Sequence, residues 1–140
     1  MSKFKVDLNS GDRPERFTEE GDYNVTIDTV EQQMTPQGFE KAVIIFKDGS
    51  NRSVKDDLLN KDTVYWRLNQ LIVATGRKDV PNGAEFDFAP RGSFFNFIKS
   101  FVGMKLAVTL KKDSYEKNGE TKTFLKVARY TKPKGEDAPF

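Results

Sequence analysis

The segment from Met104 to Lys111 alternates between two kinds of side chain at every step, which is the period of a β-strand and not of a helix. One face takes the larger apolar residues and the other takes lysines and small residues: Met104, Leu106, Val108 and Leu110 against Lys105, Ala107, Thr109 and Lys111. Asn118-Gly119 then gives a strong signal for a tight turn, and Thr121 to Tyr130 is expected to be the return strand. A long antiparallel hairpin is therefore predicted.

Three further strand patterns precede this hairpin. Asp22 to Val30 alternates like a half-buried strand, with one face formed by Tyr23, Val25, Ile27 and Thr29. Phe39 to Lys47 contains a run, 42–46, that is expected to be buried on both faces or nearly so, and Arg52 to Leu58 is expected to be the third strand. The turns between them are predicted at Thr35–Gly38 and Asp48-Gly49. Together these segments predict an antiparallel meander.

Two helices are expected between the third and fourth strands. Asp62 can cap a helix that runs from Thr63 to about Thr75 and ends at Gly76, with an apolar face formed by Val64, Leu68, Leu71, Ile72 and Thr75. Residues 77–92 contain two Pro- and Gly-bearing turns and are expected to be a loop. Ser93 to Val102 is expected to be a short apolar helix closed by Gly103.

Five strands with a helical insert between the third and fourth give the element order of an OB-fold barrel, although an SH3-like barrel or an α+β sheet also fits. The chain of 140 residues suits one domain, 1–130, with an N-terminal extension at 1–20 and a flexible acidic tail at 131–140. An OB-fold binds ligands on its second and third strands and on the loops that join strands 1–2 and 4–5. Those loops are predicted at Gln32–Gly38 and Lys112–Glu120.

The chain has no Cys and no His, which excludes Cys/His zinc sites, cysteine nucleophiles and Ser-His-Asp triads. The adjacent carboxylates Asp56 and Asp57 lie on a predicted strand, where neighbours point to opposite faces and do not converge on one metal ion. A phosphate-cradling glycine loop is also missing. We therefore expect no enzyme, cofactor or metal, and a small metal-dependent nuclease is the enzymatic alternative.

No stretch has the length and apolarity of a signal peptide or a membrane span, so a soluble intracellular protein is expected. The charge is uneven along the chain: residues 99–134 hold 10 Lys/Arg against 3 Asp/Glu, while residues 1–98 hold 13 against 16. A basic last third is typical of a polyanion-binding face. It also fits a solvated lysine-rich hairpin that avoids edge pairing.

Single-stranded nucleic acid is bound by cations that meet the backbone and by flat rings that stack on the bases. The sequence offers such groups as Tyr23, Phe39, Arg52, Lys55, Lys111, Lys112, Tyr115, Lys117, Lys122, Phe124, Lys126, Arg129 and Tyr130. On the last strand, Lys122, Phe124, Lys126 and Tyr130 are expected to share a side. Phe46 and Phe124 could instead belong to the barrel core, since Phe is usually buried. Trp66 is expected to cover a barrel end or form a subunit contact.

The end of the sequence places two acids, Glu136 and Asp137, before Pro139-Phe140. It resembles the C-terminal tip of bacterial and phage single-stranded DNA-binding proteins, which is acidic and ends in Phe. The resemblance implies a docking peptide, with the Phe140 ring in an apolar pocket of a replication or recombination partner and its α-carboxylate on a basic side chain. An ordinary charged terminus is the alternative reading.

The body, over about residues 17–130, resembles a family of small phage OB-fold proteins from replication and recombination gene clusters. The matching pieces are Gly21–Ile27, Arg52–Leu58 after the Asp48-Gly49 turn, Trp66–Gly76, and Val102–Val108 with Asn118-Gly119 following. The resemblance implies a protein that coats single-stranded DNA in the cytoplasm of a bacterial host. The alternative is a protein-interaction module, a recombination accessory or anti-host factor. The segment Phe94–Phe101 suits either a homodimer contact or a barrel plug.

Overall fold

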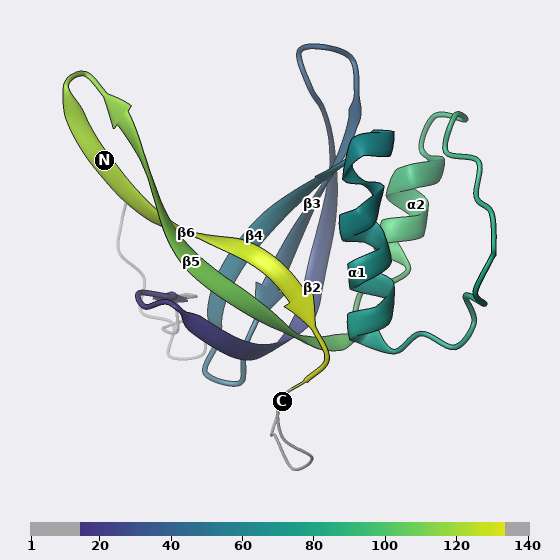
Figure 1. Cartoon of the computed structure of the whole chain (residues 1–140), viewed down its shortest axis with the longest axis horizontal. Coiled ribbons are helices and arrows are strands. Elements are labelled where there is room, and N and C mark those ends of the chain that lie inside the picture. Colours follow the sequence, from purple (N-terminus) through teal and green to yellow (C-terminus); the bar gives the residue numbers. More distant parts are fainter. Residues whose placement is uncertain (1–14, 134–140) are drawn as a thin grey trace, which may run out of the picture.

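The alternating segments of the sequence form one strongly twisted sheet with two helices packed along one side (Figure 1). The computed structural model describes residues 15–133. Its elements are β1 (Glu15–Arg16), β2 (Gly21–Met34), β3 (Glu40–Lys47), β4 (Arg52–Leu59), α1 (Tyr65–Thr75), α2 (Ser93–Lys99), β5 (Lys105–Lys117) and β6 (Glu120–Thr131). The strand order is β1-β4-β3-β2-β5-β6, so the predicted meander is confirmed and the late hairpin joins it at β2.

The sheet is mainly antiparallel and remains open. Five strands, β2 to β6, pair antiparallel, and the two-residue β1 adds a parallel pairing at Arg52 and Ser53 of β4. Within the described residues, β4 and β6 share no ladder, although closure of a five-stranded barrel would require them to pair. The predicted closed barrel is thus not confirmed, while the mainly β class with helices between the third and fourth long strands is.

A bulge in β2 changes which residues of that strand enter the core. Ile27 pairs with Phe46 while Thr29 pairs with Ile45, so Asp28 is the extra residue. Such a residue shifts the alternation of side chains beyond it. Thr29 is therefore exposed, contrary to the prediction, and Val30 packs against the core in its place.

Helix α1 begins without the predicted cap. Asp62 lies in a 3-10 turn, 62–64, and the helix starts at Tyr65 with no side-chain hydrogen bond at its N-terminus. Its apolar face is buried through Leu68, Leu71 and Ala74. The helix ends at Gly76, whose left-handed φ of 67° matches the predicted stop.

The Phe-rich insert belongs to the core. Phe94, Ile98 and Phe101 are buried, and α2 packs on β2 and β3. The Phe88 ring meets Phe94 edge-on at 5.3 Å between centroids. Helix α2 ends at Lys99, earlier than predicted, and a turn leads to Gly103. The segment therefore packs in the core on one side of the sheet, as the plug alternative expected, although this sheet is not a closed barrel.

The N-terminal extension also contributes to the fold, because Phe17 is buried at the edge of the sheet beside β1. In residues 15–133, no helix has the length and apolarity needed to span a membrane.

Most of the predicted loop 112–120 is strand. Lys117 pairs with Glu120 across the two-residue turn Asn118-Gly119, and the outer half of the β5–β6 hairpin extends away from the rest of the sheet (Figure 1). The Gln32–Gly38 loop is likewise shorter than predicted, because β2 continues to Met34 before the turn. Both ends of the sheet thus carry projecting hairpins.

Candidate nucleic-acid interface

Two exposed aromatic rings lie next to one another on the β5–β6 hairpin. Tyr115 pairs with Lys122 and Asp113 pairs with Phe124, so Tyr115 and Phe124 are diagonal neighbours on one face. Their ring centroids are 5.8 Å apart, and 51% of Tyr115 and 42% of Phe124 are exposed. Phe46 is the other Phe that could belong to the core according to the sequence, and it is fully buried. Burial in the core therefore accounts for Phe46 and not for Phe124.

Lysines surround these rings. The hairpin from 111 to 126 contains five lysines and three acids. Lys122 pairs with Glu120 at 3.0 Å and Lys126 with Asp113 at 2.9 Å. The hydrogen bond from Lys126 lowers the pKa of the Asp113 carboxyl. Three exposed lysines have no ion pair within residues 15–133 and so remain available to an anion: Lys111, Lys112 and Lys117.

Arg129 continues this basic face toward the base of the hairpin. It pairs with Thr109, two residues before Lys111 on β5, and is exposed. Its Nε donates to Thr109 Oγ1 at 3.3 Å, which holds the side chain over the sheet. Lys111 and Lys126 face one another across the strands beyond it. The hairpin therefore presents a row of cations that leads to the ring pair.

Tyr130 does not belong to this face. Val127 pairs with Leu110 while Arg129 pairs with Thr109, so Ala128 is a bulge. The bulge turns Tyr130 to the core side, where it is only 2% exposed. The prediction that it shares a side with Lys122, Phe124 and Lys126 is wrong, and its ring has no free face for a base.

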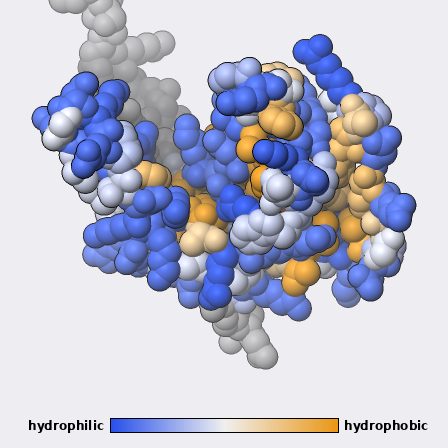
Figure 2. All heavy atoms as spheres, turned by 45° about the horizontal axis from the view of Figure 1, so that its top comes forward, coloured by the Kyte–Doolittle hydropathy of each residue, from blue (hydrophilic) through white to orange (hydrophobic). Residues whose placement is uncertain are grey.

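A groove of about 680 Å³ lies between the hairpin and the outer strand of the meander. Ser53–Asp57 of β4 form one bank and Thr123–Lys126 of β6 form the other, with Ile45 of β3 and the residues Arg16 and Phe17 also lining it. Hydrophilic side chains cover the hairpin in Figure 2, and apolar atoms appear in the recess beside it. The groove brings together Lys55, Phe124 and Lys126, three residues that the sequence predicted for nucleic-acid binding.

The charges of the groove favour an anion. Asp56 is paired with Arg67 at 2.5 Å, and Asp57 is paired with Lys41 at 3.4 Å. No acid of residues 15–133 pairs with Lys55, which is exposed on the groove wall. The two carboxylates also point to opposite sides of β4, as expected for strand neighbours, and no cluster of three acidic groups suited to a metal occurs in the described part of the chain.

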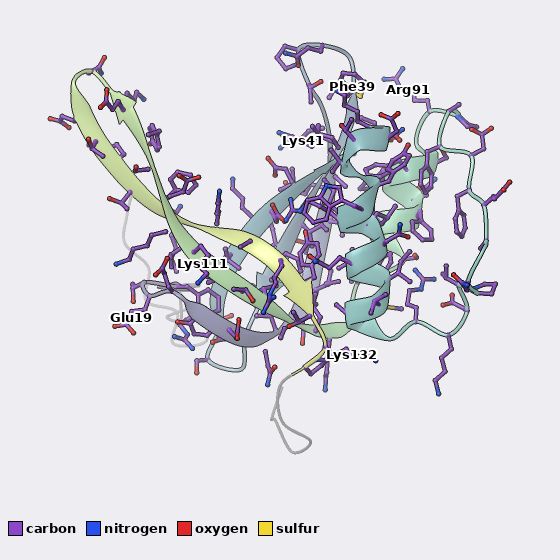
Figure 3. The ribbon with its side chains drawn as sticks, viewed as in Figure 1. Glu19, Phe39, Lys41, Arg91, Lys111 and Lys132 are labelled. Atoms are coloured by element: carbon purple, nitrogen blue, oxygen red, sulfur yellow. The ribbon has the colours of Figure 1, made fainter. Side chains whose placement is uncertain are left out.

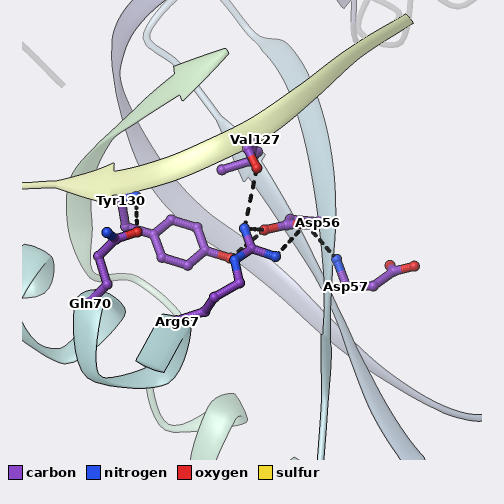
Figure 4. Close-up of polar contacts among 6 residues, drawn as sticks. All are labelled: Asp56, Asp57, Arg67, Gln70, Val127 and Tyr130. Carbon is purple, nitrogen blue, oxygen red and sulfur yellow. Dashed lines mark hydrogen bonds and ion pairs between the residues drawn. The ribbon is translucent and has the colours of Figure 1, made fainter. Parts of the chain in front are cut away.

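A polar cluster bridges the open seam behind this groove (Figure 4). The Tyr130 hydroxyl of β6 donates to Asp56 Oδ2 of β4 at 2.5 Å. Arg67 of α1 donates to the same carboxylate and, at 3.2 Å, to the Val127 carbonyl. Burial, followed by the charge of Asp56, raises the pKa of Tyr130 well above its usual value. The cluster thus holds β4, α1 and β6 together where no backbone ladder does.

Sequence reasoning missed this cluster, although one signal was present. Arg67 is the only charged residue of an otherwise uncharged helix. A lone cation beside an apolar helix face either extends to water or, when it is buried, pairs with a carboxylate from another element. Only the fold shows that the partner is Asp56.

Tyr23 and Arg52 lie elsewhere and serve packing. The Arg52 guanidinium carbon is 4.7 Å from the Phe17 ring and 5.2 Å from the Tyr23 ring. Arg52 also binds Asp48 through two contacts at 2.7 and 2.8 Å. The structure therefore does not bring this pair to the hairpin rings.

Phe39 lies at the opposite end of the sheet from Lys111, on the turn between β2 and β3 (Figure 3). It is partly exposed, and Lys61 Nζ is 5.3 Å from its ring. Together with Arg91 it lines a small pocket of about 210 Å³. It forms a separate ring-and-cation site that the sequence analysis did not distinguish from the hairpin.

The predicted docking tip, Glu136, Asp137, Pro139 and Phe140, lies outside the described residues. No protein-family model matches the chain, and none of the curated proteins matches it.

Proposed function

We propose that the protein binds single-stranded DNA without sequence preference along the β5–β6 hairpin and the adjoining groove. The observation that carries this proposal is the exposed Tyr115–Phe124 ring pair, 5.8 Å between centroids, on a hairpin where three exposed lysines have no ion pair within residues 15–133. On a projecting hairpin the two large rings expose apolar surface to water. Unpaired bases that stack on the rings would remove this surface from water.

The arrangement of the strands supports an open OB-fold. The order β4-β3-β2-β5-β6 is the order expected for the strands of a five-stranded OB barrel, and side chains from β4, α1 and β6 bridge the pair that would close it. In that fold, ligands bind on the second and third strands and on the loop between the fourth and fifth. Here those parts are β3, β4 and the hairpin, which border the groove.

In this mechanism the aromatic rings bind the bases and the lysines bind the phosphates. Stacking on Tyr115 and Phe124 contributes roughly 1–3 kcal/mol per base and is indifferent to base identity. Phosphates follow Lys111 and Lys117, which lie on the same face of β5 as Tyr115, and Lys55 contacts the backbone from the opposite bank. Duplex DNA keeps its base faces inside the stack, so it can use the lysines and not the rings.

The test is the affinity of labelled oligo-dT, measured by fluorescence anisotropy, for the double variant Tyr115→Leu with Phe124→Leu. Loss of two stacking rings should weaken binding on the order of tenfold or more per ring. The control is Phe86→Leu, which removes an exposed ring from the loop before α2 and should leave affinity unchanged.

Wild-type affinity for a duplex of equal length should be lower than for oligo-dT. If the double variant binds oligo-dT as tightly as the wild type, the rings do not contribute to binding. A wild-type chain that binds no single strand would instead favour the protein-interaction module.

We also propose that the tip recruits proteins of phage or bacterial DNA replication and recombination. Its acids exclude it from the DNA contact, so deletion of 138–140 should abolish capture of such a partner and leave oligo-dT affinity equal or higher. Loss of DNA binding in that variant would contradict a docking role.

A further inference from the structure

The outer face of α1 carries an apolar stripe. Trp66 is 59% exposed and Val73 is 62% exposed. They lie seven residues apart, which is two helical turns, so they share one side of the helix with Asn69 between them. The one charge of the helix, Arg67, is committed to Asp56. The stripe is therefore free of charge in a chain that is 31% charged.

Such a surface has the composition of a contact site. Interface centres are depleted of charged residues, and Trp is the side chain most often found to dominate binding. The packing of α1 uses its opposite face, formed by Leu68, Leu71 and Ala74. Nothing in the core thus requires Trp66 and Val73 to be apolar.

The C-terminal end of β6 lies directly beside this stripe. The Tyr130 amide donates to Gln70 Oε1 at 2.8 Å. Gln70 is four residues after Trp66 and three before Val73, and residues at these spacings are surface neighbours on a helix. The described chain then ends at Pro133, near the C-terminal end of α1 (Figure 1).

The residues that follow are long enough to reach the stripe. Seven residues come after Pro133, and seven extended residues span at most roughly 24 Å. The eleven residues of α1 extend only about 16 Å along the helix axis. The sequence that can reach it is apolar at 138–140, Ala-Pro-Phe, and acidic just before, at Glu136 and Asp137.

Two lysines lie near the C-terminal end of α1, where the acids of the tail would pass. Lys78 follows the end of α1 by three residues and is exposed, and Lys132 lies beside the same end of the helix (Figure 3). Neither has an acidic partner among residues 15–133. An extended tail that leaves β6 here would pass its two acids over these lysines before its Phe ring meets the stripe.

We propose that residues 136–140 dock on α1 of their own chain, with the Phe140 ring against Trp66 and Val73 and the acids beside Lys78 and Lys132. A tether this short gives an effective concentration on the order of millimolar, so even a millimolar contact is half occupied. The tip is then sheltered until a partner displaces it. The inference is independent of DNA binding.

The single Trp of the chain reports the contact directly. In acrylamide quenching of full-length protein without DNA, Phe140→Ala should raise the Stern–Volmer constant of Trp66 about twofold, as expected when a half-occupied cover is lost. Val73→Asp, which repels the acids and removes half of the stripe, should raise it likewise. The matched control Phe86→Ala should leave it unchanged.

Equal quenching in the wild type and Phe140→Ala would overturn the proposal. So would protection of Trp66 that increases with protein concentration, because the occupant would then be a second copy. Since no DNA is present, either failure leaves the single-strand proposal standing, and failure of DNA binding leaves this one standing.

Discussion

A phenol, a carboxylate and a guanidinium meet across the gap between β4 and β6. Tyr130, Asp56 and Arg67 come from three elements, and Asp56 accepts from both of the others. Each group is largely removed from water, so each needs its partners. At the residue scale these side chains do what a backbone ladder does in a closed barrel.

Tyr130→Phe should test this role, because it removes one buried hydrogen bond and leaves the ring and the Arg67–Asp56 pair in place. The free energy of unfolding, measured by urea denaturation, should fall by about 1 kcal/mol. Tyr115→Phe removes an exposed phenol and should have no effect. An equal change in both variants would mean that the seam contact contributes nothing specific.

The same variant should differ from the wild type at alkaline pH. Burial and the charge of Asp56 raise the folded pKa of Tyr130 above the ordinary tyrosine value of 10.0. Its contribution is therefore fully present below pH 10 and is lost as pH rises toward the folded pKa. Above pH 10, the unfolding free energy of the wild type should decline by an additional slope of about 1.4 kcal/mol per pH unit, which Tyr130→Phe lacks.

At the scale of elements, the outer half of the β5–β6 hairpin is held mainly by its own ladder. The positive φ angles of its turn, 55° at Asn118 and 77° at Gly119, fit the twist of a two-residue hairpin. Between Lys111 and Phe124, none of the hairpin residues joins the core. Such a segment should open locally more often than the central strands.

Gly119→Val should therefore separate hairpin order from global stability. A branched side chain disfavours the left-handed conformation by roughly 1–2 kcal/mol. Amides of 113–123 should exchange faster with deuterium, while those of β3 keep their protection. Oligo-dT affinity should fall with the hairpin order. Unchanged exchange in the hairpin, or equal acceleration in β3, would contradict a locally stabilised hairpin.

At the scale of the molecule, charge is separated while the net value stays at +2. The groove acids are neutralised internally by Arg67 and Lys41, which leaves the hairpin lysines and Lys55 to set the field on this face. A polyanion bound there releases counterions in proportion to the phosphates it neutralises.

The salt dependence of oligo-dT binding measures the number of phosphates that the protein neutralises. The slope of log K against log salt should be negative, and Lys111→Ala with Lys117→Ala should reduce its magnitude by about 0.7 per lysine. Lys99→Ala on α2 is the control and should leave the slope unchanged. A flat salt response in the wild type would contradict the electrostatic part of the proposal.

Local pattern alone located the five long strands, the turns that begin at Asp48 and Asn118, the end of α1 at Gly76 and the lysine-rich hairpin, because alternation and turn chemistry act between near neighbours. It did not set the lengths of β2, β5 and β6, which extend further than predicted where they pair with a neighbouring strand. Only the tertiary structure decided that Tyr130 is core and Phe124 is exposed. A bulge at Ala128 reverses every later side chain of β6, and it arises from pairing with β5. Tertiary packing likewise left the sheet open and placed Arg67 in the gap, since both depend on how distant segments meet.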